Sequence, residues 1–274
     1  MSANGVEDFR QKTPTNAVSI ATTLLGAGAE VDALAGTYGG GKNQTTMNLL
    51  VSSTHPAEAG VQVPLVETLL DFGAAVNGVE DNESPLMTAL AFGYTDAAEA
   101  LARRGARVDS VLAAAALGRA DLIRRLVADG RTLEPHVPLV APGWFRLPND
   151  PQAHIGLAMV WACKLGRTAV VELLLKKGVD PTVPDGDGQT GLHWAAAHGY
   201  MDVIDLLLAH DAALEAKNKY DGTVLDQTLW FARNDPTDGV DYSAVVQKLI
   251  DAGARVDLYP SMKEHVNQVL RRQL

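Results

Sequence analysis

A glycine-rich stretch is the segment of this sequence that comes nearest to a ligand-binding motif. Residues 36–42 read GTYGGGK and match the first seven positions of a phosphate-binding loop, in which backbone amides and a lysine hold an anion. The following Asn43 lacks the hydroxyl that would hold magnesium, so nucleotide binding is disfavoured. We expect an elongated loop with a glycine tip instead, from which Tyr38 and Lys42 can contact a partner.

Other chemistry-bearing residues form no catalytic pattern. Asp185-Gly-Asp187-Gly resembles the start of a calcium loop but lacks its closing glutamate, which favours a solvated turn. Cys163 follows Ala162 at a small-residue packing position, and neither a nucleophile elbow nor a dinucleotide fingerprint occurs. The histidines lack metal-ligand spacing, at positions 55, 136, 154, 193, 198, 210 and 265. We therefore expect no enzyme, no metal and no cofactor.

Composition narrows the class of partner. The chain has 274 residues, of which 47% are hydrophobic, and its 23 basic and 33 acidic residues give a net charge of -10. Such a charge repels phosphate backbones and anionic lipids, so neither nucleic acid nor membrane is an expected partner. The apolar runs are too short to span a bilayer, and the start MSANGVEDFR lacks the features of a secretory signal. We expect a cytoplasmic protein that is monomeric on its own.

One phrase recurs along the chain and organises it. Its copies are LLGAGAEVD ending at Asp32, LLDFGAAVN at Asn77, LARRGARVD at Asp109 and KLIDAGARVD at Asp257. Each copy reads as the end of a helix, because two apolar residues are followed by a glycine that can adopt the left-handed conformation. The sequence therefore predicts a repeated helical unit.

A second turn residue precedes each helix end at a fixed spacing. Twelve residues separate the members of the pairs Gly93 and Gly105, Gly118 and Gly130, Gly166 and Gly178, and Gly199 and Asp211. This spacing suits a tight turn and a helix of two to three turns, so each unit is a pair of short helices. Two further units contain the extra segments STHPAEAG and ARNDPTDG between their helices. The first unit keeps only its second helix, near residues 16–25.

Two segments resemble the ankyrin signature T-P-L-H-x-A and the helix that follows it. They are QTGLHWAAAHGYMDVIDLLLAH, residues 189–210, and ESPLMTALAFGYTDAAEALARRGARVD, residues 83–109. Gly191 replaces the proline and Asp211 replaces a glycine. The resemblance implies an all-α fold, an ankyrin-repeat solenoid of about seven helix-turn-helix units with irregular insertions. We expect an N-terminal tail or cap over residues 1–14, repeats over 15–257 and a capping helix over 258–274, where Pro260 precedes a capping box.

Ankyrin resemblance also implies where a partner docks, because the family presents turn tips and first-helix positions on its concave side. Trp230 and Phe231 are the expected anchors, since large aromatics dominate interface energetics. The alternative is that the enlarged loop after them folds back and buries both. The positions implicated in this way are Glu80, Asp81, Glu83, Phe92, Asp187, Gln189, His198, Lys219, Tyr220, Trp230 and Phe231.

The longest insertion is rich in proline. Residues 131–154 contain five prolines around Trp144 and Phe145, and this spacing predicts no helix. The aromatic pair either binds a partner or fills a gap left by a missing turn. Trp161 and Trp194 occupy one repeat position, which favours stacking between units, and His193 is expected to hydrogen-bond the backbone of a turn.

The leading hypothesis is a non-enzymatic protein-protein interaction module that binds another protein on its concave, turn-lined face. The alternative is a small-molecule sensor or an enzyme whose site is built by the insertions at 33–60, 131–154 and 232–243. A third hypothesis is a structural spacer within a longer polypeptide. A deep pocket beside Trp144 or Trp230 favours the second hypothesis, and a flat open face favours the first.

Overall fold

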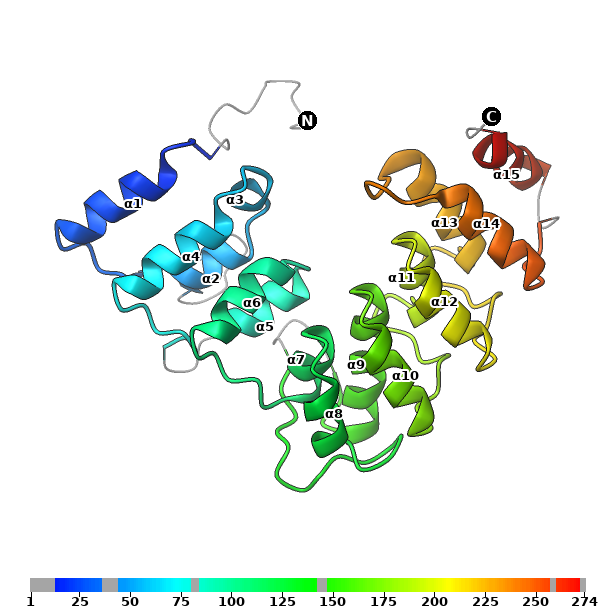
Figure 1. Cartoon of the computed structure of the whole chain (residues 1–274), viewed down its shortest axis with the longest axis horizontal. Coiled ribbons are helices and arrows are strands. Elements are labelled where there is room, and N and C mark those ends of the chain that lie inside the picture. Colours follow the sequence, from blue (N-terminus) through cyan, green and yellow to red (C-terminus); the bar gives the residue numbers. More distant parts are fainter. Residues whose placement is uncertain (1–12, 36–43, 80–83, 142–146, 257–259, 272–274) are drawn as a thin grey trace. The chain divides into compact units, whose positions relative to one another are not determined.

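The computed structural model describes residues 13–35, 44–79, 84–141, 147–256 and 260–271. The chain forms two compact units, the first running to Val108 and the second beginning at Asp109. Both units consist mainly of paired helices (Figure 1), which confirms the predicted mostly helical fold. The number of repeat units and their outer boundaries stay predictions.

The first unit begins with a single helix and continues as helix pairs. Helix α1 packs on α4, α2 packs on α4 and α5, and α6 packs on α4 and α5. The short helix α3 lies within the STHPAEAG segment, so this predicted insertion is helical rather than irregular. The bounds of the elements are α1 Ala17–Gly26, β1 Leu34–Ala35, β2 Gln44–Thr45, α2 Thr46–Val51, α3 Thr54–Glu58, α4 Gln62–Asp71, α5 Pro85–Ala91 and α6 Thr95–Arg103.

A two-stranded ladder flanks the glycine-rich stretch. Strands β1 and β2 are antiparallel, with Leu34 opposite Thr45 and Ala35 opposite Gln44. This pairing matches the expected elongated loop, because it brings together the residues on either side of 36–43. The predicted contact residues at its tip, Tyr38 and Lys42, lie outside the described residues.

The second unit stacks its helices in two rows. The first helices pack in the order α7, α9, α11 and α13, and the second helices α8, α10 and α12 pack in the same order. Helix α15 packs on both α13 and α14. The bounds are α7 Val111–Ala116, α8 Ala120–Leu126, α9 Pro151–Lys164, α10 Thr168–Lys176, α11 Gly191–Ala197, α12 Met201–Leu208, α13 Val224–Asn234, α14 Tyr242–Asp251 and α15 Pro260–Arg271.

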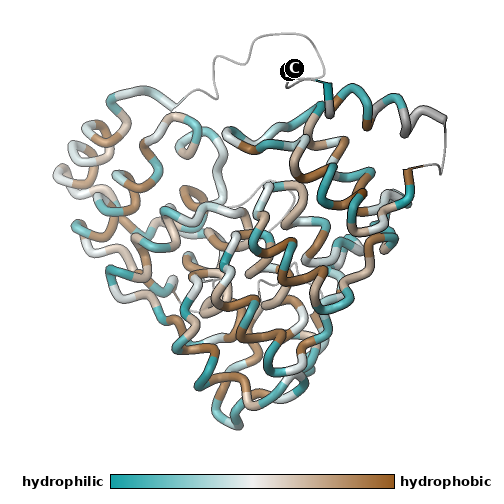
Figure 2. The backbone as a smooth tube through the Cα atoms, turned by 45° about the vertical axis from the view of Figure 1, so that its right-hand side comes forward, coloured by the Kyte–Doolittle hydropathy of each residue, from teal (hydrophilic) through white to brown (hydrophobic). Residues whose placement is uncertain are grey.

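Capping side chains begin the first helices, and small residues allow these helices to pack closely. The hydroxyl or carboxylate at the start of several of these helices accepts a backbone N–H three residues later, as Ser110, Asp150 and Thr223 do. All six residues of α7 are buried, four of them alanines. Alanine side chains let neighbouring helices approach closely, so each helix pair buries the apolar face of the next pair. Figure 2 shows hydrophobic and hydrophilic residues alternating along the helices.

The proline-rich prediction is wrong at its C-terminal end. Helix α9 begins at Pro151, four residues inside the segment for which no helix was expected. Proline is favoured at the first position of a helix because its missing N–H would have no partner there, and the Asp150 side chain caps the helix by accepting from Ala153 N at 2.9 Å. The expected contact residues Trp144 and Phe145 lie outside the described residues.

The helix end expected at Gly130 is also wrong. Helix α8 ends at Leu126, and the chain then turns back so that Val127 forms an antiparallel bridge with Leu133. Gly130 serves a different purpose, because a Cβ atom there would lie 2.4 Å from the carbonyl oxygen of Gly178. The glycine permits a close approach of two turns of the backbone.

Replacing Gly130 by alanine is expected to destabilise the protein by about 1–3 kcal/mol, because the added methyl group must displace backbone rather than a flexible side chain. The matched control is Gly186→Ala, where a Cβ atom would meet nothing within 4 Å. Urea denaturation followed by circular dichroism measures both variants. Equal midpoints for the two variants would contradict the packing argument.

Asp211 occupies the place of the glycine that follows several other second helices, such as Gly178 after α10. It has φ 59°, whereas Gly178 at the equivalent place has φ 83°. A side chain in this left-handed region costs about 1–2 kcal/mol, part of which the extra freedom of glycine in the unfolded chain offsets. Asp211→Gly should therefore raise the free energy of unfolding by about 0.5–1 kcal/mol.

The control for this substitution is Gly178→Ala, which introduces the same strain at a helix end that now lacks it and should lower the unfolding free energy by about 1 kcal/mol. Chemical denaturation of both variants checks the pair of signs. A destabilised Asp211→Gly variant would mean that the aspartate side chain stabilises this turn by more than its strain costs.

Candidate functional site

Two turns that connect successive repeat units within the second compact unit have the same pattern of hydrogen bonds. Asp185 Oδ1 accepts the backbone N–H groups of Asp187 and Gln189, both at 2.9 Å. One unit later, Asn218 Oδ1 accepts from the N–H groups of Tyr220 at 3.0 Å and Gly222 at 3.1 Å. A side chain that binds its own turn fixes the tip, so the following residues are presented in a defined conformation.

These contacts explain the acidic turn that resembles a calcium loop. The other oxygen of Asp185, Oδ2, accepts the indole N–H of Trp194 at 2.9 Å. Its carboxylate is therefore engaged with the protein itself. Among the residues that the structure describes, no group of three histidine, cysteine, aspartate or glutamate side chains could hold a metal ion.

Adjacent turn tips are joined to each other through Lys219. Its backbone N–H donates to the carbonyl oxygen of Asp187 at 2.8 Å, and its Nζ donates to Asp187 Oδ1 at the same distance. The ammonium group also lies 5.0 Å from the ring centroid of Tyr220. The hydrogen bond to Asp187 raises the pKa of Lys219. Three of the expected contact residues thus form one exposed cluster.

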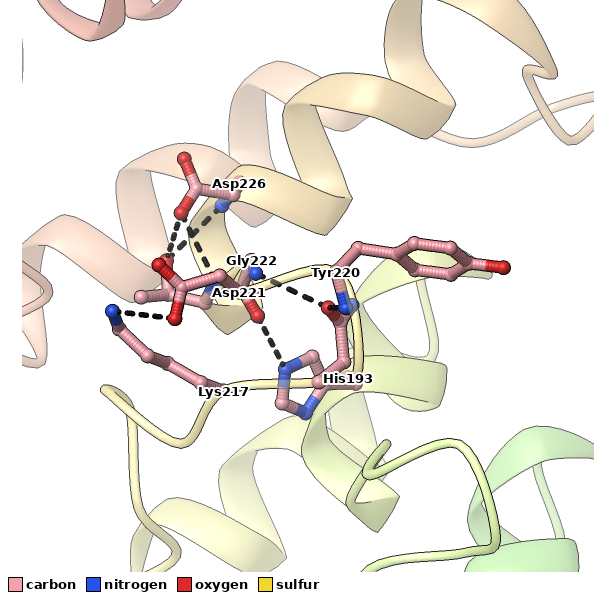
Figure 3. A network of polar contacts seen from close by, with 8 residues as sticks. His193, Lys217, Tyr220, Asp221, Gly222 and Asp226 are labelled. Atoms are coloured by element: carbon pink, nitrogen blue, oxygen red, sulfur yellow. Dashed lines mark hydrogen bonds and ion pairs between the residues drawn. The ribbon is translucent and has the colours of Figure 1, made fainter.

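His193 connects a first helix to the next turn, as Figure 3 shows. Its Nδ1 accepts the backbone N–H of Thr190 at 3.1 Å, and its Nε2 lies 3.4 Å from the carbonyl oxygen of Gly222. The side chain is fully buried. Desolvation by burial lowers its pKa, and the contact with Thr190 N–H also requires an unprotonated Nδ1. His193 is therefore a structural residue that binds backbone, as the sequence predicted.

Four rings run across two first helices, and we call Trp194, His198, Phe231 and Trp230 the aromatic row. Trp194 and His198 stack with centroids 5.9 Å apart, and His198 meets the edge of Phe231 at 5.8 Å. Phe231 meets Trp230 at 5.2 Å, also edge to face. At the other end of the row, the Nζ atom of Lys164 lies 4.3 Å from the Trp194 ring centroid. The contact between His198 and Phe231 joins the two helices.

The enlarged loop after α13 covers the row only in part. Thr237 Oγ1 lies 3.3 Å from His198 Nδ1, and the Tyr242 hydroxyl donates to the carbonyl oxygen of Ala197 at 2.8 Å. These bonds hold the loop against α11 and leave Phe231 half-buried. Trp230 keeps 54% of its surface exposed. The loop therefore does not bury both rings, which was the alternative expected from the sequence.

A groove with a volume of about 490 Å³ lies beside Trp230, and we call it the C-terminal groove. Helix α13 forms one wall, α15 forms another, and the turn at 220–222 closes one end. Its lining residues are Tyr220, Asp221, Gly222, Asp226, Leu229, Trp230, Arg233, Asn234, Gln268 and Val269. Aromatic, carboxylate and amide groups thus converge on one space.

The remaining expected contact residues differ in their surroundings. Phe92 belongs to the first unit, where it is exposed and stacks on Tyr94 with centroids 6.4 Å apart. Gln189 belongs to the Asp185 turn and accepts from the side chain of Gln227 at 3.4 Å, so it links this turn to α13. The expected residues Glu80, Asp81 and Glu83 lie outside the described residues.

Sequence reasoning missed Lys164, Thr237 and the α15 wall of the groove. Lys164 contacts Trp194 and Thr237 contacts His198, each from an adjacent repeat unit. Gln268 and Val269 lie more than thirty residues from Trp230 along the chain. No local signal marks such contacts. The repeat register alone could have placed Lys164 near Trp194, because Lys164 ends α9 and Trp194 lies three residues before the end of α11, the next first helix.

Stacked helix pairs joined by hydrogen-bonded turns define the class of helical repeat proteins. Comparison with known proteins identifies the kind of repeat, since the family model for ankyrin repeats in many copies matches residues 159–231. The chain is an ankyrin repeat protein. The match covers α11, most of α13 and the two turns described above.

Curated relatives agree with this assignment. The Ankyrin repeat and KH domain-containing protein mask-1 of Caenorhabditis elegans is 25% identical over 75% of this chain and 7% of its own length. The Ankyrin repeat domain-containing protein 46 of Rattus norvegicus is 39% identical over 22% of this chain and 25% of its own length. A match to Serine/threonine-protein kinase 12 of Arabidopsis thaliana is 28% identical and covers 29% of this chain and 17% of that protein. The matched segments thus span a quarter or less of each relative.

We expect stability to depend on pH because of two buried histidines, His154 and His193, and the half-buried His198. Desolvation lowers the pKa of His154, His193 and His198. Above the unfolded pKa of about 6.5, both states bind no proton at these sites, and below it the unfolded state binds more protons. The melting temperature should therefore fall as the pH is lowered from 7.5 to 5.5.

The variant His193→Asn should reduce this slope, whatever its effect on stability at pH 7.5. His55→Gln, an exposed histidine of α3, is the matched control and should leave the slope unchanged. Differential scanning calorimetry at several pH values measures both slopes. An unaltered slope in His193→Asn would show that this imidazole accepts its proton in the folded state.

Proposed function

We propose that this protein is a non-enzymatic module that binds another protein through the turn tips and first helices of its second unit. Ankyrin repeats are generally protein-protein interaction modules and are typically non-catalytic. The single observation that carries the choice of surface is Trp230, a large aromatic side chain that is half exposed although it is supported by Phe231. Tryptophan is the residue type most enriched among the side chains that dominate binding energy.

Preorganisation is the proposed mechanism. The side chains of Asp185 and Asn218 fix the two turns. The edge-to-face contact between His198 and Phe231 joins the two halves of the aromatic row. A partner that docks on such a surface orders few groups, so little conformational entropy is lost on binding. Tyr220, which is 74% exposed, and Lys219 extend the proposed surface from the row to the turn tip.

Catalysis finds no support in the described residues. Burial raises the pKa of the Cys163 thiol, which disfavours the thiolate that a nucleophile requires. His193 and Asp185 are engaged with backbone and indole groups. The structure describes no helix long and apolar enough to cross a bilayer.

The C-terminal groove is the one observation that favours the alternative, a small-molecule sensor. Its volume of about 490 Å³ lies within the range of ligand pockets, which is roughly 300–1,000 Å³. A small ligand from a cell extract that raises the melting temperature of the native chain and loses this effect in Trp230→Ala would support the sensor.

The protein-binding proposal predicts that Trp230→Ala weakens binding at least about 30-fold, the loss typical of an interface hot spot. Affinity capture from the native lysate with cross-linking and mass spectrometry identifies the partner, and calorimetry with the purified partner gives the two dissociation constants. Folding should be unaffected because the side chain is half exposed.

Phe72→Ala is the matched control, since Phe72 is an exposed aromatic residue that follows a second helix, α4. It should bind like the native chain. Equal binding by Trp230→Ala and the native chain would overturn the proposed surface.

A further inference from the structure

The C-terminal groove has a defined chemical polarity along α13. Asp226, Leu229, Trp230 and Arg233 follow one another at helical spacing, so they form a single stripe on the groove side of the helix. The stripe begins with a carboxylate and ends with a guanidinium group. Arg233 lies seven positions after Asp226, which corresponds to about 10 Å along the helix axis.

Other aromatic side chains of this region already hold a cation from the chain itself. Lys164 lies over Trp194 at 4.3 Å, and Lys219 lies over Tyr220 at 5.0 Å. The ring contact described for Trp230 is the edge-to-face contact with Phe231. Within the described part of the chain, the face of the indole of Trp230 is therefore the ring surface in the groove that holds no cation.

The carboxylates of the groove lie next to this ring. Asp221 and Asp226 line the same space as Trp230, and the Asp221 side chain is 82% exposed although Lys217 binds it at 2.8 Å. The two carboxylates are balanced locally by two cations, Lys217 and Arg233, whereas the whole chain carries a net charge of -10. The overall charge attracts a basic ligand.

The floor of the groove is apolar. Leu229 is buried to 7% exposure and Val269 of α15 to 9%, and both line the groove. A volume of about 490 Å³ accommodates a few side chains, whereas a single helix is about 10–12 Å across. The space therefore suits a short extended segment better than a helix.

We propose that the C-terminal groove binds a short extended segment of a partner protein, in which an arginine or lysine lies over Trp230 and an adjacent apolar side chain packs on Leu229 and Val269. The cation is attracted by the face of the indole ring and by the carboxylate of Asp221, whose side chain is 82% exposed, whereas Oδ2 of Asp226 already accepts hydrogen bonds from Thr223. The inference rests on the proposed protein-binding function and names the chemistry of the segment that is bound.

The test uses the full chain labelled with 5-fluorotryptophan, in which the sequence provides four tryptophan signals. A Trp230→Phe variant assigns the signal of Trp230. The probes are the peptides acetyl-GRLRLG-amide and acetyl-GELELG-amide, which differ only in the sign of their charges. We expect the basic peptide to shift the Trp230 signal at millimolar concentration, more weakly at 300 mM than at 20 mM salt, and the acidic peptide to leave it in place.

Two variants refine the result. Asp221→Asn should weaken binding of the basic peptide about two- to five-fold, whereas Glu58→Gln, the same charge change at an exposed position of the first unit, should leave it unchanged. Trp230→Leu keeps an apolar surface but removes the aromatic face, so binding of the basic peptide, measured for this variant and the native chain by titration calorimetry, should weaken at least about two-fold. Circular dichroism establishes that each variant folds.

The proposal is overturned if the acidic peptide shifts Trp230 as much as the basic one, if neither peptide moves it, or if Trp230→Leu binds like the native chain. Failure here is distinguishable from failure of the proposed function. A partner whose capture depends on Trp230, together with silent peptides, overturns the basic segment alone. Silent peptides together with capture that is independent of Trp230 overturn both.

Discussion

Close approach of neighbouring first helices is the constraint on which the second unit depends. Alanines of α7 and α11 are fully or almost fully buried, and Cys163 of α9 packs against Gly191 at the start of α11. A Cβ atom on Gly191 would lie 2.7 Å from the Cys163 sulfur, which explains why glycine stands where the ankyrin signature has proline. Stability in such an array comes from the interface between units, because no pair has a core of its own.

The same stacking positions the candidate site. Trp194 and Phe231 lie on successive first helices and meet through His198, so the aromatic row exists because the helices are adjacent. The turns are fixed by Asp185 and Asn218, which occupy corresponding places in consecutive units. A partner surface made in this way needs no specialised loop, only substitutions at positions that the repeat already exposes.

Several cations of this chain make contacts within the protein itself. Arg167 Nε donates to the carbonyl oxygen of Ala116 at 2.8 Å, and Lys177 Nζ donates to that of Val127 at 2.6 Å. Lys164 and Lys219 lie over aromatic rings. These positive charges thus join one repeat unit to the next.

The sequence by itself determined the helix pairs, since recurring turn residues such as Gly178 mark helix ends that local backbone conformation requires, and it determined the backbone role of His193. Tertiary structure alone decided that Gly130 serves a close contact, that the loop leaves Trp230 exposed, and that α15 closes a groove. The physical reason is the range of the forces involved. Turn and helix signals act within a few residues, whereas exposure and grooves depend on packing between segments far apart in the chain.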